Sequence, residues 1–229
     1  MSKTTKSIIK NITILAIALS ITTFISCFNK KDANANSTTQ TKPIAQKTVL
    51  KLNHEAPAFE VTDSNGNAHK LSDYKGKIVV LEWKNSGCPF VKKHYNSGNM
   101  QALQTYAKEQ DVVWLSVISS AKGKQGYVSS KECNDTIKNE KSNATAVLLD
   151  PNGELGKRYN AKVTPHMYII DKEGNLVYNG AIDSIPSSSQ SDVEKATNYI
   201  KVGIDQLKAG KPVSTQETRP YGCSVKYKI

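Results

Sequence analysis

A buried strand that leads directly into a proline-started helix is the feature that most constrains this fold. The run Ile78–Trp83 is largely apolar and rich in β-branched residues, which is typical of a strand covered on both faces. Gly87, Cys88 and Pro89 follow, and Pro89 suits the first position of a helix because its missing N–H would have no partner there. The pattern predicts that Cys88 begins a helix at the end of a buried strand.

Strands and helices alternate along the rest of the chain. Before the first buried strand, a turn-rich segment at 63–67 joins two short extended pieces into a hairpin. Further strands are predicted at 112–118, 145–149, 166–170 and 176–181, and helices at 89–107 with a break at 96–98, 131–139, 153–159 and 191–209. The order predicts an α/β sandwich in which helices flank a central mixed sheet.

The last of these helices has the clearest sequence signals. Ser191 and Glu194 have the spacing of a capping box, and Gly210 followed by Pro212 would end the helix. We therefore expect this helix to begin at Ser191.

The N-terminus has the pattern of a secretory signal: a basic start, an uncharged apolar stretch at 12–25, and Ser26 before Cys27. The stretch is short for a membrane span, which needs about 20 residues. A small residue directly before Cys27 resembles the lipobox of bacterial lipoproteins, in which the cysteine is acylated. The alternative is plain signal cleavage near Ser26. The lipobox interpretation predicts a periplasm-facing protein of the bacterial cell envelope, anchored to a membrane through lipid on Cys27.

These patterns divide the chain into four segments. Residues 1–27 are predicted to be a signal peptide with its lipobox cysteine, 28–47 a polar flexible tether, 48–209 the globular domain and 210–229 a C-terminal tail that carries Cys223. The net charge of +11 does not indicate nucleic-acid binding, because the lysines are scattered and Arg158 and Arg219 are the only arginines.

The cysteines beyond Cys27 indicate thiol chemistry. Cys88, Cys133 and Cys223 lie in a compartment where disulfides persist, and three is an odd number, so at least one thiol is left free or redox-active. Free N–H groups and the helix dipole at a helix start lower a cysteine's pKa from about 8.5. Cys88 is thus a candidate nucleophile. The positive charges of Lys84, Lys92 and Lys93 could add to the electrostatic field that stabilises its thiolate. The alternative is a buried structural cysteine, and for Cys133 a half-buried core position is the favoured interpretation.

A second element precedes the strand at 166–170. A cis bond between Thr164 and Pro165 would bring the Thr164 backbone against the start of the Cys88 helix. With this element in place the chain resembles the thioredoxin superfamily, and within it the peroxiredoxin-like redoxin branch related to alkyl hydroperoxide reductase and thiol-specific antioxidant proteins. The resemblance covers about residues 50–209 and is carried by Ala56–Phe59, Lys70–Lys77, Gly87–Val91, Thr164-Pro165 and Ile170–Gly174.

The resemblance implies a thioredoxin-like fold and an oxidoreductase without a cofactor. Cys88 would act on a peroxide, as an antioxidant thiol peroxidase, or on a protein disulfide, with Thr164 and Pro165 shaping the site where the sulfur meets its partner. Electrons would come from a thioredoxin-like protein or a small thiol. The tail around Cys223 also resembles this branch, which makes Cys223 a candidate resolving thiol for Cys88. The alternative is a structural thiol that pins the tail.

Departures from the family pattern limit the reactions that this site is expected to carry out. Val91 stands where a thioredoxin or a ResA-like reductase has its second cysteine, so exchange confined to one loop is excluded. The positions of the peroxiredoxin threonine, proline and arginine are occupied by Asn85, Leu81 and Pro165. The nucleophile therefore resembles that of a peroxiredoxin, whereas its peroxide-activating surroundings do not.

A non-enzymatic role is the competing hypothesis. Cys88, His94 and His166 are soft or borderline metal ligands, so a thioredoxin-fold lipoprotein that binds copper or a protein partner is the alternative function. Because Cys88 and His94 point to different helix faces, we expect no metal site.

Overall fold

The computed structural model describes residues 50–228, which include nearly all of the predicted globular domain and of the tail. Cys27, the signal peptide and the tether at 28–47 lie outside these residues. Within the described part, no helix is long and apolar enough to cross a membrane.

The predicted central mixed sheet forms the centre of the fold, and it has six strands. The strand order is β1-β9-β8-β4-β5-β6, in which β4, β5 and β6 are parallel and the other neighbours are antiparallel. The strands are β1 (His54–Glu55), β4 (Val79–Trp83), β5 (Val113–Ile118), β6 (Ala146–Leu149), β8 (His166–Ile170) and β9 (Asn175–Gly180). All side chains of β4, β5 and β8 are buried, because elements cover both faces of these central strands.

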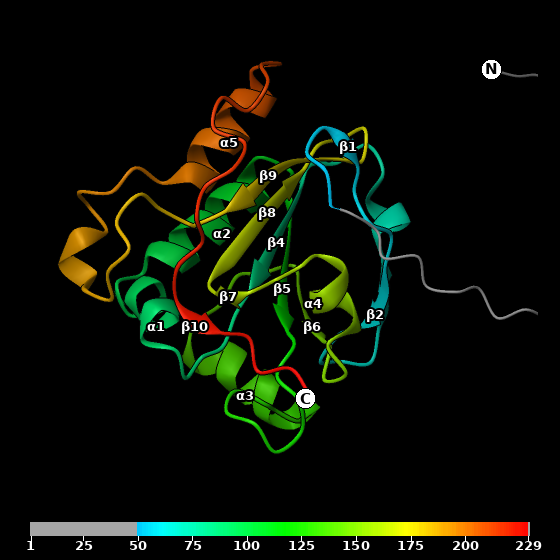
Figure 1. Cartoon of the computed structure of the whole chain (residues 1–229), viewed down its shortest axis with the longest axis vertical. Coiled ribbons are helices and arrows are strands. Elements are labelled where there is room, and N and C mark those ends of the chain that lie inside the picture. The colour runs from blue at the N-terminus through cyan, green and yellow to red at the C-terminus, as the bar shows by residue number, and fades with distance from the viewer. Residues whose placement is uncertain (1–49, 229) are drawn as a thin grey trace, which may run out of the picture. The chain divides into compact units, whose positions relative to one another are not determined.

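Helices cover the two faces of this sheet (Figure 1). On one face, α1 (Pro89–Asn96), α2 (Asn99–Glu109) and α5 (Tyr199–Lys208) pack on a core that contains Val80, Trp114 and Ile169. On the other, α4 (Glu154–Arg158) and the N-terminal segment enclose a second core around Leu81, Leu115 and Tyr168. α3 (Ser130–Asn139) begins at the predicted capping box of Ser129 and Glu132.

The predicted N-terminal hairpin is formed by β2 (Glu60–Thr62) and β3 (Ala68–Lys70). The Asp63 carboxylate accepts hydrogen bonds from the N–H groups of Asn65 and Asn67, each at 2.8 Å, and so closes the turn. A 3-10 turn, η1 (Leu71–Tyr74), leads from the hairpin toward β4.

The C-terminal tail returns across the domain and passes beside the Cys88 helix start. Its strand β10 (Cys223–Ser224) pairs antiparallel with β7 (Val163–Thr164), so that Cys223 lies opposite Thr164. In Figure 1 the red tail runs from α5 past β9 to this short ladder. Beyond it, the Val225 N–H donates to the Lys162 carbonyl at 2.9 Å. A tail that docks on the domain is thus part of the fold.

The prediction that the last helix begins at Ser191 is wrong. Only a 3-10 turn, η2 (Gln190–Asp192), forms there, and α5 begins at Tyr199 with the Asn198 side chain accepting a hydrogen bond from the Lys201 N–H at 3.0 Å. Ser184 and Thr197 exchange hydrogen bonds across the preceding loop. These contacts fold residues 184–197 into a closed loop, so the capping signal at Ser191 does not start a helix there.

Replacement of the true cap should therefore destabilise the protein, whereas replacement of the apparent one should not. We expect Asn198→Ala to lower the free energy of unfolding by about 1 kcal/mol, because the Lys201 N–H loses its partner. Ser191 contacts the exposed Ser189 hydroxyl, so Ser191→Ala should leave stability unchanged. Urea denaturation of both variants tests this, and equal losses would contradict the assignment.

Candidate active site

Cys88 occupies the N-cap position of α1, where the sequence places it. The β4 strand ends at Trp83, and Pro89 begins the helix as predicted. The Cys88 side chain is fully buried, and its Sγ–H donates to the Thr164 carbonyl at 3.1 Å. The bond between Thr164 and Pro165 is cis. The structure therefore brings together Cys88, Thr164 and Pro165, three of the residues singled out from the sequence.

Hydrogen-bond donors around the sulfur favour the Cys88 thiolate. Burial raises its pKa, but donors converge on the sulfur from the Cys223 thiol, the N–H groups of Val91 and Cys223, and the Thr164 hydroxyl. Together they lower the pKa of Cys88 below its ordinary value. The Val91 N–H belongs to the first turn of α1, so the helix start contributes as expected.

Cys223 reaches Cys88 from the tail. The Thr164 hydroxyl donates to the Cys223 carbonyl at 3.4 Å, and Cys223 lies opposite Thr164 in the β10–β7 ladder. The preceding Gly222 has a φ of +139°, and a Cβ there would lie 2.0 Å from the Thr164 oxygen. Only glycine allows the tail to approach this closely.

The pKa values of the two thiols shift in opposite directions. Burial, the hydrogen bond to Cys88 and the charge of Cys88 raise the pKa of Cys223 to about 11. Of the two thiols, Cys88 therefore ionises first as the pH rises, and Cys223 keeps its proton to a higher pH. Because Cys223 is half-buried while Cys88 is fully covered, an outside thiol meets Cys223 first.

The lysines expected to strengthen the field at Cys88 bind other groups or face solvent. Lys84 Nζ donates to Glu140 at 2.5 Å, and Lys93 Nζ donates to Asp183 at 2.9 Å. Lys92 is exposed. The lowered pKa of Cys88 comes from hydrogen bonds and not from these ammonium groups.

The peroxiredoxin-like positions hold side chains with other partners. The Asn85 amide oxygen accepts from the Gly87 N–H at 2.9 Å, and its nitrogen donates to Gln125 at 2.8 Å. Asn85 thus shapes the loop before Cys88. Pro165 occupies the arginine position, and Arg158, elsewhere in the sequence, donates to the Ala58 carbonyl on the other side of the sheet.

Cys133 and the two candidate histidines do not join the site. Cys133 packs with Ile118 and Val147, and burial raises its pKa, which fits a core position deeper than the predicted half-buried one. The His94 ring forms a hydrogen bond with the Asn99 side chain, and the His166 ring forms one with the Asn179 side chain. Within residues 50–228, no group of three or more His, Cys, Asp or Glu side chains is placed to hold a metal ion.

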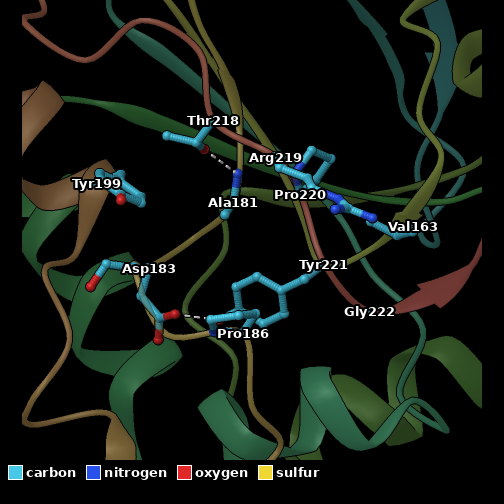
Figure 2. Close-up of a pocket in the computed structure, with 11 residues that line it drawn as sticks. Val163, Ala181, Asp183, Pro186, Tyr199, Thr218, Arg219, Pro220, Tyr221 and Gly222 are labelled. Carbon is cyan, nitrogen blue, oxygen red and sulfur yellow. Dashed lines mark hydrogen bonds between the residues drawn. The ribbon is translucent and has the colours of Figure 1, made fainter.

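Sequence reasoning missed the polar residues that flank the tail. A cavity of about 510 Å³ lies between residues 218–222 and the loop after β9, and Asp183 and Tyr221 face each other at its wall (Figure 2). The Tyr221 hydroxyl donates to the Asp183 carboxylate, which also accepts from Lys93. The single signal in the sequence was Tyr221 two positions before Cys223, and nothing there pointed to Asp183.

The chain is similar to proteins of known thiol chemistry. The AhpC/TSA family model matches residues 52–179. The thiol-disulfide oxidoreductase ResA of Geobacillus kaustophilus is 25% identical over 174 residues, which cover 72% of this chain and 86% of the relative. ResA of Bacillus subtilis is 26% identical, with 58% and 69% covered.

Solved structures share the fold. An uncharacterized conserved protein from Geobacillus kaustophilus matches with a TM-score of 0.67 and 25% identity, over 79% of this chain and 94% of that one. A hypothetical protein from Sinorhizobium meliloti, SMc02350, has a TM-score of 0.67 at 20% identity, over 79% and 97%. The predicted thioredoxin-like fold is confirmed.

The two thiols should titrate in a fixed order. Brief alkylation with iodoacetamide over a pH series, read by mass spectrometry at each cysteine, should give a midpoint for Cys88 below that of Cys223. Cys223→Ala should raise the Cys88 midpoint, because a donor to the thiolate is lost. Cys88→Ser should lower the Cys223 midpoint from about 11, because the neighbouring negative charge is removed. A Cys88 midpoint at or above that of Cys223 would contradict this electrostatic account.

Proposed function

The chain belongs to the AhpC/TSA family and is a thiol-based oxidoreductase, and on this premise we propose that it is a two-cysteine thiol–disulfide oxidoreductase. Cys88 is the nucleophile and Cys223 is the resolving thiol. One geometric observation carries the proposal: the β10–β7 ladder sets Cys223 opposite Thr164, whose carbonyl accepts the hydrogen bond of the Cys88 thiol at 3.1 Å. In this arrangement the pKa of Cys88 is lowered while that of Cys223 is raised. A nucleophile and its resolving partner need this asymmetry.

The reaction on a disulfide substrate proceeds in two exchanges. The Cys88 thiolate attacks one substrate sulfur, forms a mixed disulfide and releases the other substrate sulfur as a thiolate. Cys223 then loses its proton and attacks the Cys88 sulfur, which releases the second substrate thiolate. The substrate gains two electrons, and the protein's two thiols become a Cys88–Cys223 disulfide.

A thiol donor then reduces this disulfide. The donor thiolate attacks Cys223, because that sulfur is the accessible one, and Cys88 leaves because the thiol of lower pKa is the better leaving group. A second donor thiol releases Cys223. We propose a thioredoxin-like protein or a small thiol as this donor, because either supplies the two thiol exchanges that the step needs.

Thr164 and Pro165 are proposed to shape the place where the sulfurs exchange. The Thr164 carbonyl lies 3.1 Å from the Cys88 sulfur, and its backbone pairs with Cys223 in the β10–β7 ladder. This arrangement supports a role in aligning the two sulfurs. We place the protein in the bacterial cell envelope, tethered through lipid on Cys27, on the strength of the Ser26-Cys27 pattern.

Peroxide reduction is the second candidate, favoured by the family match and the lowered pKa of Cys88. The thiolate would attack a peroxide oxygen, giving a sulfenic acid and releasing water or an alcohol. Cys223 would then displace water to form the same disulfide. Asn85 stands in the position of the activating threonine, but its side chain is hydrogen-bonded to Gly87 and Gln125. Because these bonds engage the side chain elsewhere, we expect the reaction with peroxide to be slower than the reaction with disulfides.

Turnover of single-cysteine variants tests the proposal. With insulin as the disulfide substrate and dithiothreitol as the donor, Cys88→Ser should abolish turnover. Cys223→Ser should lower it by about a hundredfold and accumulate a mixed disulfide on Cys88, because the second exchange is lost. Cys133→Ala should retain activity, because that thiol packs in a separate core.

Two outcomes decide between the alternatives. Wild-type turnover by Cys223→Ser would make Cys223 a structural thiol and would overturn the two-cysteine proposal. The same variants assayed with hydrogen peroxide rank the two substrates, and faster turnover of peroxide than of insulin would favour the second candidate.

A further inference from the structure

A buried ion pair lies beside the active site without contacting either sulfur. Lys93 of α1 donates to the Asp183 carboxylate at 2.9 Å and to the Ile185 carbonyl at 3.0 Å. The Lys93 and Asp183 side chains are 0% and 3% exposed. Because an unpaired charge at such depth is strongly unfavourable, each group holds the other in place.

Tyr221 of the tail completes this pair. Its hydroxyl donates to Asp183 Oδ1, which also accepts the Ile185 N–H at 3.1 Å, and lies 3.4 Å from Lys93 Nζ. Its ring packs edge to face on Phe90 of α1, with ring centres 5.8 Å apart. We call Lys93, Asp183 and Tyr221 the latch. It ties the tail to the same helix that begins at Cys88.

The latch is connected to the resolving thiol through a very short stretch of chain. Only Gly222 separates Tyr221 from Cys223, and Gly222 is held against the Thr164 carbonyl. Through this single residue, outward movement of Tyr221 would pull on Cys223 and on its pairing with Thr164. The latch also holds the tail over Cys88, which is 0% exposed.

We propose that the Lys93–Asp183–Tyr221 latch positions Cys223 and controls access to Cys88, so that its opening admits a substrate and its closing drives resolution. This inference rests on the proposed function and adds the control of its two exchanges. Lys93, Asp183 and Tyr221 are positioning residues, since they touch neither reacting sulfur.

The latch has opposite effects on the two exchanges. A closed tail hinders a bulky disulfide from reaching Cys88 and so slows the first exchange. The same closed tail keeps Cys223 at a high effective concentration beside Cys88 and so speeds the second. Weakening the latch must therefore accelerate the first exchange and slow the second, a pattern that loss of catalytic power alone does not produce.

Tyr221→Phe is the sharpest variant, because it keeps the ring on Phe90 and removes the hydroxyl that binds Asp183. The matched control is Tyr106→Phe. Tyr106 makes the same kind of contact with Asp205, which is paired with Lys201 at 2.8 Å, but it joins α2 to α5 on the surface. Both variants lose one tyrosine–aspartate hydrogen bond, and only one of them touches the tail.

The experiment follows the reduced full-length chain, carrying Cys27→Ser and Cys133→Ala, with dithiobis(nitrobenzoic acid) in a stopped-flow instrument. The first exchange releases one coloured aryl thiolate as Cys88 forms a mixed disulfide. The second releases another as the Cys88–Cys223 disulfide forms, at a rate independent of reagent concentration. Peptide mass spectrometry identifies both products, and thermal unfolding shows that each variant is folded.

We expect Tyr221→Phe to speed the first release severalfold and to slow the second about tenfold, the size of effect of a hydrogen bond to a charged group. Tyr106→Phe should match the parent in both steps. The latch would be overturned if folded Tyr221→Phe kept the parent's rates in both steps, or if Tyr106→Phe changed both rates as much as Tyr221→Phe did. Either outcome would leave the proposed function intact. A parent that releases one aryl thiolate and forms no Cys88–Cys223 disulfide would overturn the proposed function itself.

Discussion

The site depends on the antiparallel pairing of β10 with β7. This ladder sets Cys223 opposite Thr164, whose carbonyl accepts the hydrogen bond of the Cys88 thiol. The pairing brings a half-exposed sulfur to a buried one and supplies the Cys223 N–H and thiol as donors to Cys88. Without it, Cys88 would lose two of the donors that offset its burial. The chemistry of the helix-start cysteine is therefore completed by the far end of the chain.

Local patterns predicted most of the fold and the nucleophile. The buried strand followed by Gly87, Cys88 and Pro89 places the sulfur at a helix start whatever the rest of the chain does, because strand burial and the proline preference act over a few residues. The cis bond before Pro165 and the nearness of Thr164 to Cys88 were likewise expected. The strand, the helix start and the proline each follow from a short segment, whereas the nearness of Thr164 to Cys88, 76 positions apart, was expected only through the cis bond.

Contacts between distant segments explain what the sequence left open. The role of Cys223 was undecided because the docking of a tail depends on its fit against Thr164, 59 positions away. Lys93 remained one of three lysines that could strengthen the field at Cys88, because nothing in the sequence showed that the loop after β9 would bring Asp183 to it. The capping signal at Ser191 was overridden in the same way, by contacts between Ser184 and Thr197.

The central claim is that Cys88 and Cys223 form one redox couple. Equilibration of the native protein in a series of glutathione redox buffers, followed by acid quenching, alkylation and peptide mass spectrometry, measures the oxidation state of each cysteine. If the two form such a couple, the free thiols of Cys88 and Cys223 disappear together in a single two-electron transition, and one disulfide-linked peptide appears. Cys133 stays a thiol throughout. Loss of Cys88 with Cys223 still free to be alkylated would contradict this claim.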